Sequence, residues 1–70
     1  MTQVKLQKGE REVELKVVES WSGNFWLYLN TTKNGETTKR ERQYPTQAAA
    51  NAAWQQKAVA WAKRGYAVVS

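Results

Sequence analysis

The sequence of 70 residues contains no cysteine, no histidine and no aspartate. The chain therefore cannot form a disulfide, a histidine or thiolate zinc site, a thiol nucleophile or a Ser-His-Asp triad. Its glutamates are spread over predicted strands and one turn without forming a pair, and its glycines are isolated and form no phosphate-binding loop. We expect a protein that is not an enzyme and that holds no metal and no cofactor.

Long apolar runs are also missing. No segment approaches the roughly 20 apolar residues that a membrane-spanning helix requires, and residues 1–10, MTQVKLQKGE, lack the apolar stretch of a signal peptide. The length fits one domain, residues 1–70. The absence of cysteine agrees with a cytoplasmic location. We expect a single cytoplasmic domain that does not associate with membranes.

The charges are distributed unevenly along the chain. The net charge is +5. Lysine, arginine and glutamate cancel within residues 1–30, so residues 31–70 carry the whole excess. Such asymmetry favours a polyanionic partner. The alternative is ordinary solubility, since a small domain commonly carries a net charge of about 2–8 in magnitude.

Apolar residues alternate with polar ones along residues 3–8 and 11–19, and this period of two predicts two half-buried strands. We expect a two-residue turn at Lys8-Gly9, because glycine tolerates the positive φ that such turns need. That turn pairs Gln7 with Glu10 and places Lys5 opposite Glu12.

A second predicted hairpin joins strands over residues 25–32 and 36–44, and Asn34-Gly35 between them is typical of a type I′ turn. A strict two-residue turn places Arg40 and Arg42 on the same face as Phe25, Leu27 and Leu29. A one-residue bulge would instead move both arginines beside Trp26 and Tyr28. The pattern favours the strict register near Tyr44 and leaves the face of the arginines open.

The alanine-rich stretch over residues 46–64 predicts the one helix of the chain. Thr46 is a favourable N-cap residue and Gly65 a favourable C′ residue. At 100° per residue, Trp54 and Trp61 project close together with small alanines around them, which indicates a face packed on the sheet. Residues 66–69 are expected to form a short final strand or an extended tail. The predicted fold class is α+β, a four-stranded antiparallel meander covered on one face by a single C-terminal helix.

Three features favour a nucleic-acid-binding module. Trp26 and Tyr28 lie on the strand face opposite the core row, where bases could stack. Cations gather on the adjacent hairpin, and the helix carries cations but no acidic residue. Each feature also has a purely structural explanation, such as packing, a solvated edge strand or the helix dipole. The candidate nucleic-acid-binding residues are Trp26, Tyr28, Lys33, Lys39, Arg40, Arg42, Lys57, Lys63 and Arg64.

Residues 25–69 resemble a WGR domain. The resemblance rests on a Gly-led polar strand, Gly35 to Tyr44, an alanine-rich helix, and the step Lys63-Arg64-Gly65-Tyr66. The chain has Tyr28-Leu29-Asn30 where that family has its Trp-Gly-Arg triplet. Residues 25–63 are also similar to the arm-binding domains of phage integrases. Both resemblances imply a DNA-binding α+β module, so DNA rather than RNA is the expected partner.

An alternative function is that of a small protein-binding accessory or inhibitor module of the phage or plasmid type. It would act through the exposed Trp26 and Tyr28 and through an edge strand open to β-augmentation. The edge strand over residues 36–44 also permits self-association, so the expected state is a monomer or a weak homodimer.

Overall fold

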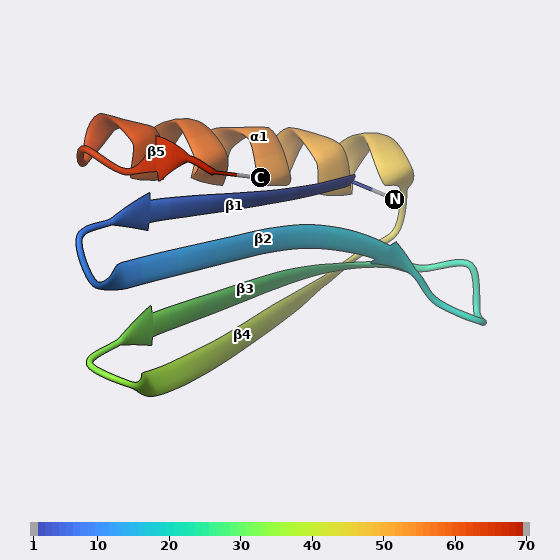
Figure 1. Cartoon of the computed structure of the whole chain (residues 1–70). Helices are drawn as coiled ribbons and strands as arrows, with labels where there is room; N and C mark the ends of the chain where they lie inside the picture. Colours follow the sequence, from blue (N-terminus) through green and yellow to red (C-terminus); the bar gives the residue numbers. More distant parts are fainter. Residues whose placement is uncertain (1, 70) are drawn as a thin grey trace.

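A computed structural model describes residues 2–69 as five strands and one helix (Figure 1). The chain forms an antiparallel meander, in which each long strand pairs with the next, and the sheet order is β4-β3-β2-β1-β5. The helix lies on one face of this sheet, so the predicted α+β class is confirmed. No helix in residues 2–69 is long and apolar enough to cross a membrane. The elements are β1 (Thr2–Lys8), β2 (Arg11–Glu19), β3 (Phe25–Lys33), β4 (Glu36–Tyr44), α1 (Gln47–Lys63) and β5 (Ala67–Val68).

The β3–β4 hairpin has the predicted turn. Asn34 and Gly35 both have positive φ, 53° and 81°, as a type I′ turn requires. Phe25 therefore pairs with Tyr44, and the strict register continues without a bulge to Lys33 opposite Glu36. The register predicted near Tyr44 is confirmed, and the bulged alternative is wrong.

The predicted register of the β1–β2 hairpin is wrong by two residues. Gly9 and Glu10 form the loop, so Gln7 pairs with Glu12 and Lys5 with Glu14. Gly9 occupies the first loop position with φ 61°, the place that glycine takes in a type II′ turn. A shift of two residues keeps every side chain on its face, and for this reason the hydrophobic alternation did not reveal it.

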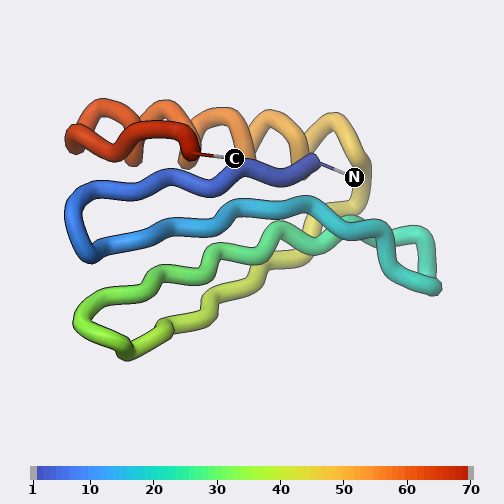
Figure 2. Tube along the Cα trace, viewed as in Figure 1, coloured from blue at the N-terminus to red at the C-terminus, as the bar shows by residue number. Residues whose placement is uncertain are grey.

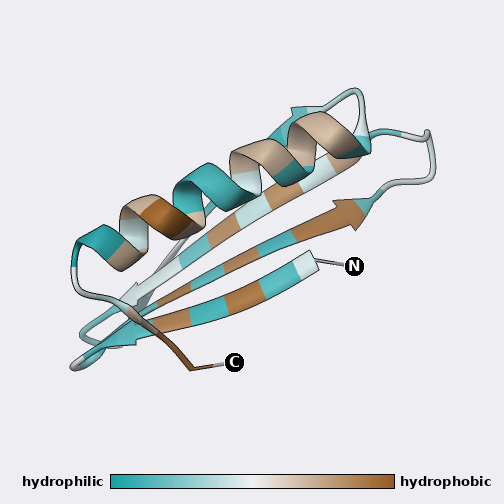
Figure 3. Cartoon of the chain, turned by 90° about the horizontal axis from the view of Figure 1, so that it is seen from above, coloured by the Kyte–Doolittle hydropathy of each residue, from teal (hydrophilic) through white to brown (hydrophobic). Residues whose placement is uncertain are grey.

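The core lies between the helix and the sheet. Its buried strand residues occupy alternate positions, and Figure 3 shows these apolar positions as bands that alternate with polar ones; α1 adds one buried residue, Ala50. Trp54 packs against two buried clusters and its Nε1 donates a hydrogen bond to the carbonyl oxygen of Leu15, at 3.2 Å. The buried hydrophobic residues are Leu6, Val13, Leu15, Val17, Leu27 and Ala50.

Both ends of α1 are capped as the sequence predicts. The Thr46 hydroxyl accepts a hydrogen bond from the amide of Ala49 at 3.2 Å. At the other end Gly65 has φ 95°, and the amide of Tyr66 donates to the carbonyl of Trp61, which is the 6→1 bond of a Schellman motif. The rings of Tyr66 and Trp61 meet edge to face with centroids 5.1 Å apart. These caps fix where the helix begins and ends on the sheet.

The helix crosses the sheet obliquely. Near its start, Ala50 and Ala53 pack with Phe25 and Tyr44, at the end of the sheet where β3 and β4 meet the helix. Near its end, Trp61 packs over β1 and β2. The chain then turns, and β5 pairs with the outer edge of β1 (Figure 2). Of the two alternatives for the tail, the structure therefore has the short final strand, of two residues. The turn of the β3–β4 hairpin is consequently left uncovered, and Figure 1 shows it diverging from α1.

Candidate nucleic-acid interface

The strict register of the β3–β4 hairpin decides where the arginines lie. Arg42 pairs with Leu27 and Arg40 pairs with Leu29. Because Leu27 is buried against the helix, both arginines project on the helix side of the sheet. Lys39 alternates with them and therefore projects on the opposite face, which carries no helix and is called the open face below.

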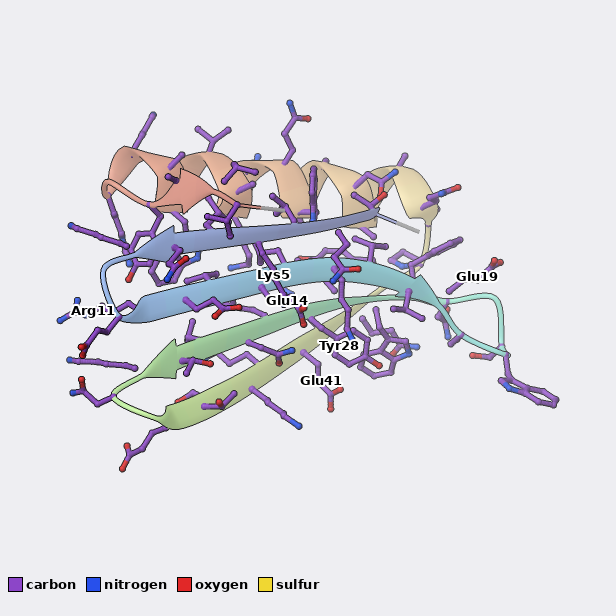
Figure 4. All side chains as sticks on the ribbon, viewed as in Figure 1. Lys5, Arg11, Glu14, Glu19, Tyr28 and Glu41 are labelled. Carbon is purple, nitrogen blue, oxygen red and sulfur yellow. The ribbon has the colours of Figure 1, made fainter. Side chains whose placement is uncertain are left out.

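Trp26 and Tyr28 also lie on the open face, since both alternate with the buried Leu27 along β3. Tyr28 pairs with Glu41, and Figure 4 shows both side chains on this face of the sheet. The sequence left open which face carries the arginines. The structure places the aromatic pair on one face of the sheet and Arg40 and Arg42 on the other, so these candidate residues do not form one surface.

Charges on the open face neutralise one another. Lys5 forms an ion pair with Glu12 at 3.7 Å, and this is the only ion pair within residues 2–69. Glu14 accepts hydrogen bonds from Gln3 and Asn30, at 3.1 and 3.2 Å. The strand registers place three lysines and three glutamates on this face, so it has no net charge: Lys5, Lys16, Lys39, Glu12, Glu14 and Glu41.

The helix side of the sheet, in contrast, is basic beside β4. The diverging hairpin leaves a groove between β4 and α1, floored by Leu29 and Thr31 and walled by Thr38 and Ala60. Its polar lining is basic, and its apolar floor continues toward Leu27. We call this feature the basic groove. Its four cations are Arg40 and Arg42 from β4 and Lys57 and Arg64 from the helical segment.

No carboxylate neutralises these four cations within residues 2–69, since none of them takes part in an ion pair. Glu41 borders the Arg42 end of the groove, but its side chain lies on the open face (Figure 4). A cation paired with a carboxylate would be partly neutralised, whereas these remain available to an anion. The basic groove thus concentrates the excess charge that the sequence places in residues 31–70.

Two of the four cations are held against aromatic rings. The guanidinium of Arg64 lies over the Trp61 ring, 4.7 Å from its centroid. The guanidinium of Arg42 lies over the Tyr44 ring at 5.7 Å. A cation–π contact restricts the side chain without neutralising its charge, and leaves the N–H groups at the guanidinium edge free to donate. The aromatic residues beside the groove therefore position arginines for an anionic ligand.

The remaining predicted residues lie apart from this cluster. Lys33 lines a broader hollow at the hairpin end of the groove, where Glu36 is its strand partner. Lys63 lies on the outer surface of the helix beside Val59. Of the nine residues that the sequence singled out, the structure brings together Arg40, Arg42, Lys57 and Arg64.

Three residues near these surfaces were missed from the sequence. Lys8 and Arg11 come from the β1–β2 hairpin and reach the same hollow as Arg64. The Lys8 ammonium donates to the Arg64 carbonyl at 2.8 Å, a contact between chain positions far apart that no local pattern reveals. Trp21 is fully exposed. Its neighbours Ser20, Ser22 and Gly23 are typical of a turn, so the sequence did carry a signal that this tryptophan is exposed.

Residues 2–69 contain no cluster of three or more carboxylates that could hold a metal ion. Comparison of the chain with protein-family models, with curated proteins and with solved structures finds no match.

Proposed function

We propose that this domain is a non-catalytic nucleic-acid-binding module that holds the phosphate backbone in the basic groove. The observation that carries the proposal is the convergence of Arg40, Arg42, Lys57 and Arg64 on one groove without a carboxylate partner. Phosphate contacts by arginine and lysine supply most of the affinity of sequence-independent binding. Thr38 is an exposed residue of the groove wall, and its hydroxyl adds a neutral donor for a phosphate oxygen.

The mode of binding differs from the one that the sequence first suggested. Trp26 and Tyr28 face away from the groove and lie on a surface without net charge. Contacts in the groove are therefore expected to be made to the backbone and not through base stacking. Weak dependence on base sequence follows, because backbone contacts carry no direct sequence information. DNA is the expected ligand by the resemblance to WGR and integrase arm-binding domains, and RNA is the competitor to test.

Fluorescence anisotropy with labelled oligonucleotides tests the proposal. Duplex DNA, single-stranded DNA and RNA of one length are titrated with the protein between about 20 and 200 mM salt. Four phosphate contacts predict a slope of log K against log salt of about −3.6 on duplex DNA and about −2.8 on a single strand. The absence of measurable binding to all three ligands at the lowest salt would refute the proposed function.

The matched variants remove equal charge from the two faces of the sheet. R40Q/R42Q takes two cations from the basic groove, whereas K16Q/K39Q takes two from the open face. We expect R40Q/R42Q to weaken binding at least about tenfold, which is about 1.4 kcal/mol. K16Q/K39Q should change the affinity much less, since those lysines lie outside the groove.

A further inference from the structure

The basic groove continues past Arg64. At the end of the sheet where the turns of both hairpins and the end of α1 lie together (Figure 1), it opens into the broader hollow that Lys33 lines. We call this second feature the hairpin-end hollow. The groove and the hollow share Thr31 and Thr38 from the strands and Trp61 and Arg64 from the helical side. They therefore form one continuous surface, which we call the cationic track.

Three cations from the strands line the hairpin-end hollow. Arg11, labelled in Figure 4, lies two residues before the buried Val13 on β2, so it projects on the helix side of the sheet. By the same alternation Lys33 projects on that side from β3. The Lys8 ammonium lies 2.8 Å from the Arg64 carbonyl, which places it at the end of α1. The strands thus extend the positive charge beyond the basic groove.

Carboxylates are scarce along the cationic track. Glu12 borders the hollow, but it alternates with the buried Val13 and forms its ion pair with Lys5 on the open face. Glu36, opposite Lys33, projects on the helix side and forms no ion pair within residues 2–69. The track therefore has four cations in the basic groove and three in the hollow, with Glu36 as the one carboxylate that projects beside them from the described strands. Such a row of charge attracts a polyanion.

The length of the cationic track matches an extended polyanion. Along β4, the distance from Arg42 to Glu36 is about 20 Å, at about 3.3 Å per residue. One strand of B-DNA presents a phosphate about every 3.4 Å along the helix axis, so this length faces about six phosphates. A small anion would occupy one cluster of cations, whereas a nucleic-acid backbone carries negative charge at regular intervals along the whole length.

We propose that one strand of the nucleic acid follows the entire cationic track, and that Arg11 and Lys33 bind phosphates beyond those held in the basic groove. This inference rests on the proposed function and extends its binding site. It gives a binding role to Arg11, which the sequence did not suggest, and joins Lys33 to the same ligand as Arg40. Contacts in the hollow add to the salt dependence that the basic groove alone produces.

The variant R11Q/K33Q tests the extension in the anisotropy assay on duplex DNA of about 20 base pairs, which covers the track. Loss of two phosphate contacts should reduce the slope of log K against log salt by about 1.8. K16Q/K39Q makes the same change in net charge on the open face and should keep the wild-type slope. Arg11 and Lys33 are exposed, so circular dichroism of R11Q/K33Q should show the wild-type melting temperature.

A second variant tests the same path with the opposite sign. E36Q removes the carboxylate beside the hollow and should strengthen binding at least about twofold. E14Q makes the same change in net charge on the open face and should leave the affinity near that of wild type.

Three results would overturn the extended path. R11Q/K33Q could keep the wild-type slope while R40Q/R42Q reduces it, which would confine the ligand to the basic groove and leave the proposed function intact. E14Q could strengthen binding as much as E36Q, which would show a response to net charge alone. Polyglutamate of equal total charge could displace the DNA at equal concentration, which would assign the track to an acidic protein segment. Failure of the proposed function itself is distinct, because wild type would then bind no oligonucleotide at low salt.

Discussion

Replacing Trp54 by alanine is expected to leave the domain largely unfolded at 25 °C. Trp54 packs against both buried clusters, one centred on Leu15 and the other on Leu27, so its removal weakens the attachment of the helix to both. Truncation of a core tryptophan costs about 3–5 kcal/mol. A core of this size contributes only about 3–5 kcal/mol of net stability. The loss therefore equals most of the free energy of unfolding.

Urea unfolding followed by far-ultraviolet circular dichroism measures this prediction, since the substitution removes a fluorophore. W54F keeps an aromatic ring but removes the indole N–H, so it leaves the Leu15 carbonyl without the donor 3.2 Å away and leaves part of the indole volume unfilled. We expect W54F to lose about 1–2 kcal/mol of the free energy of unfolding. W21A is the matched control, because it makes the same change at a fully exposed site and should shift stability by less than about 0.5 kcal/mol.

Two outcomes would contradict the packing described for Trp54. W54A could unfold cooperatively at the wild-type urea concentration, or W21A could lose as much stability as W54A. Either result would mean that the helix does not depend on this indole for its attachment to the sheet.

Three further predictions concern the cap, the groove and the edge strand. T46A should lower the free energy of unfolding by about 1 kcal/mol, measured by urea titration, because the amide of Ala49 loses its acceptor. K57Q should weaken oligonucleotide binding more than K63Q in the anisotropy assay, since only Lys57 lines the groove; equal effects would contradict the assignment. Light scattering should show a monomer, because antiparallel pairing of the β4 edges of two copies, centred on Arg40, would place the Arg40 side chain of one copy directly opposite that of the other; a dimer would refute this.

Local chemistry made most of the fold predictable from the sequence. Asn34-Gly35 fixed a hairpin register because its two positive φ angles permit one tight turn, and Tyr44 took its predicted place opposite Phe25. Thr46 and Gly65 marked the ends of the helix for equally local reasons. Where one or two residues determine the backbone conformation, the sequence pattern is sufficient to predict it.

The β1–β2 register and the binding groove were not predictable in the same way. Gly9 can serve either of two neighbouring turns, and both keep the same side chains on the core face. The groove depends on the oblique path of the helix, which follows from how Trp61 and Ala50 pack at opposite ends of the sheet. Such packing is a property of the whole chain. It determines that Lys57 lines the same groove as Arg40, whereas Lys63 does not.

The salt dependence of DNA binding by the two matched double variants tests the basic groove most directly. R40Q/R42Q should reduce the slope of log K against log salt on duplex DNA by about 1.8, the value for two lost phosphate contacts. K16Q/K39Q, with the same change in net charge on the open face, should keep the wild-type slope. Equal slopes for the two variants would show that binding follows net charge alone and would contradict a ligand held in the basic groove.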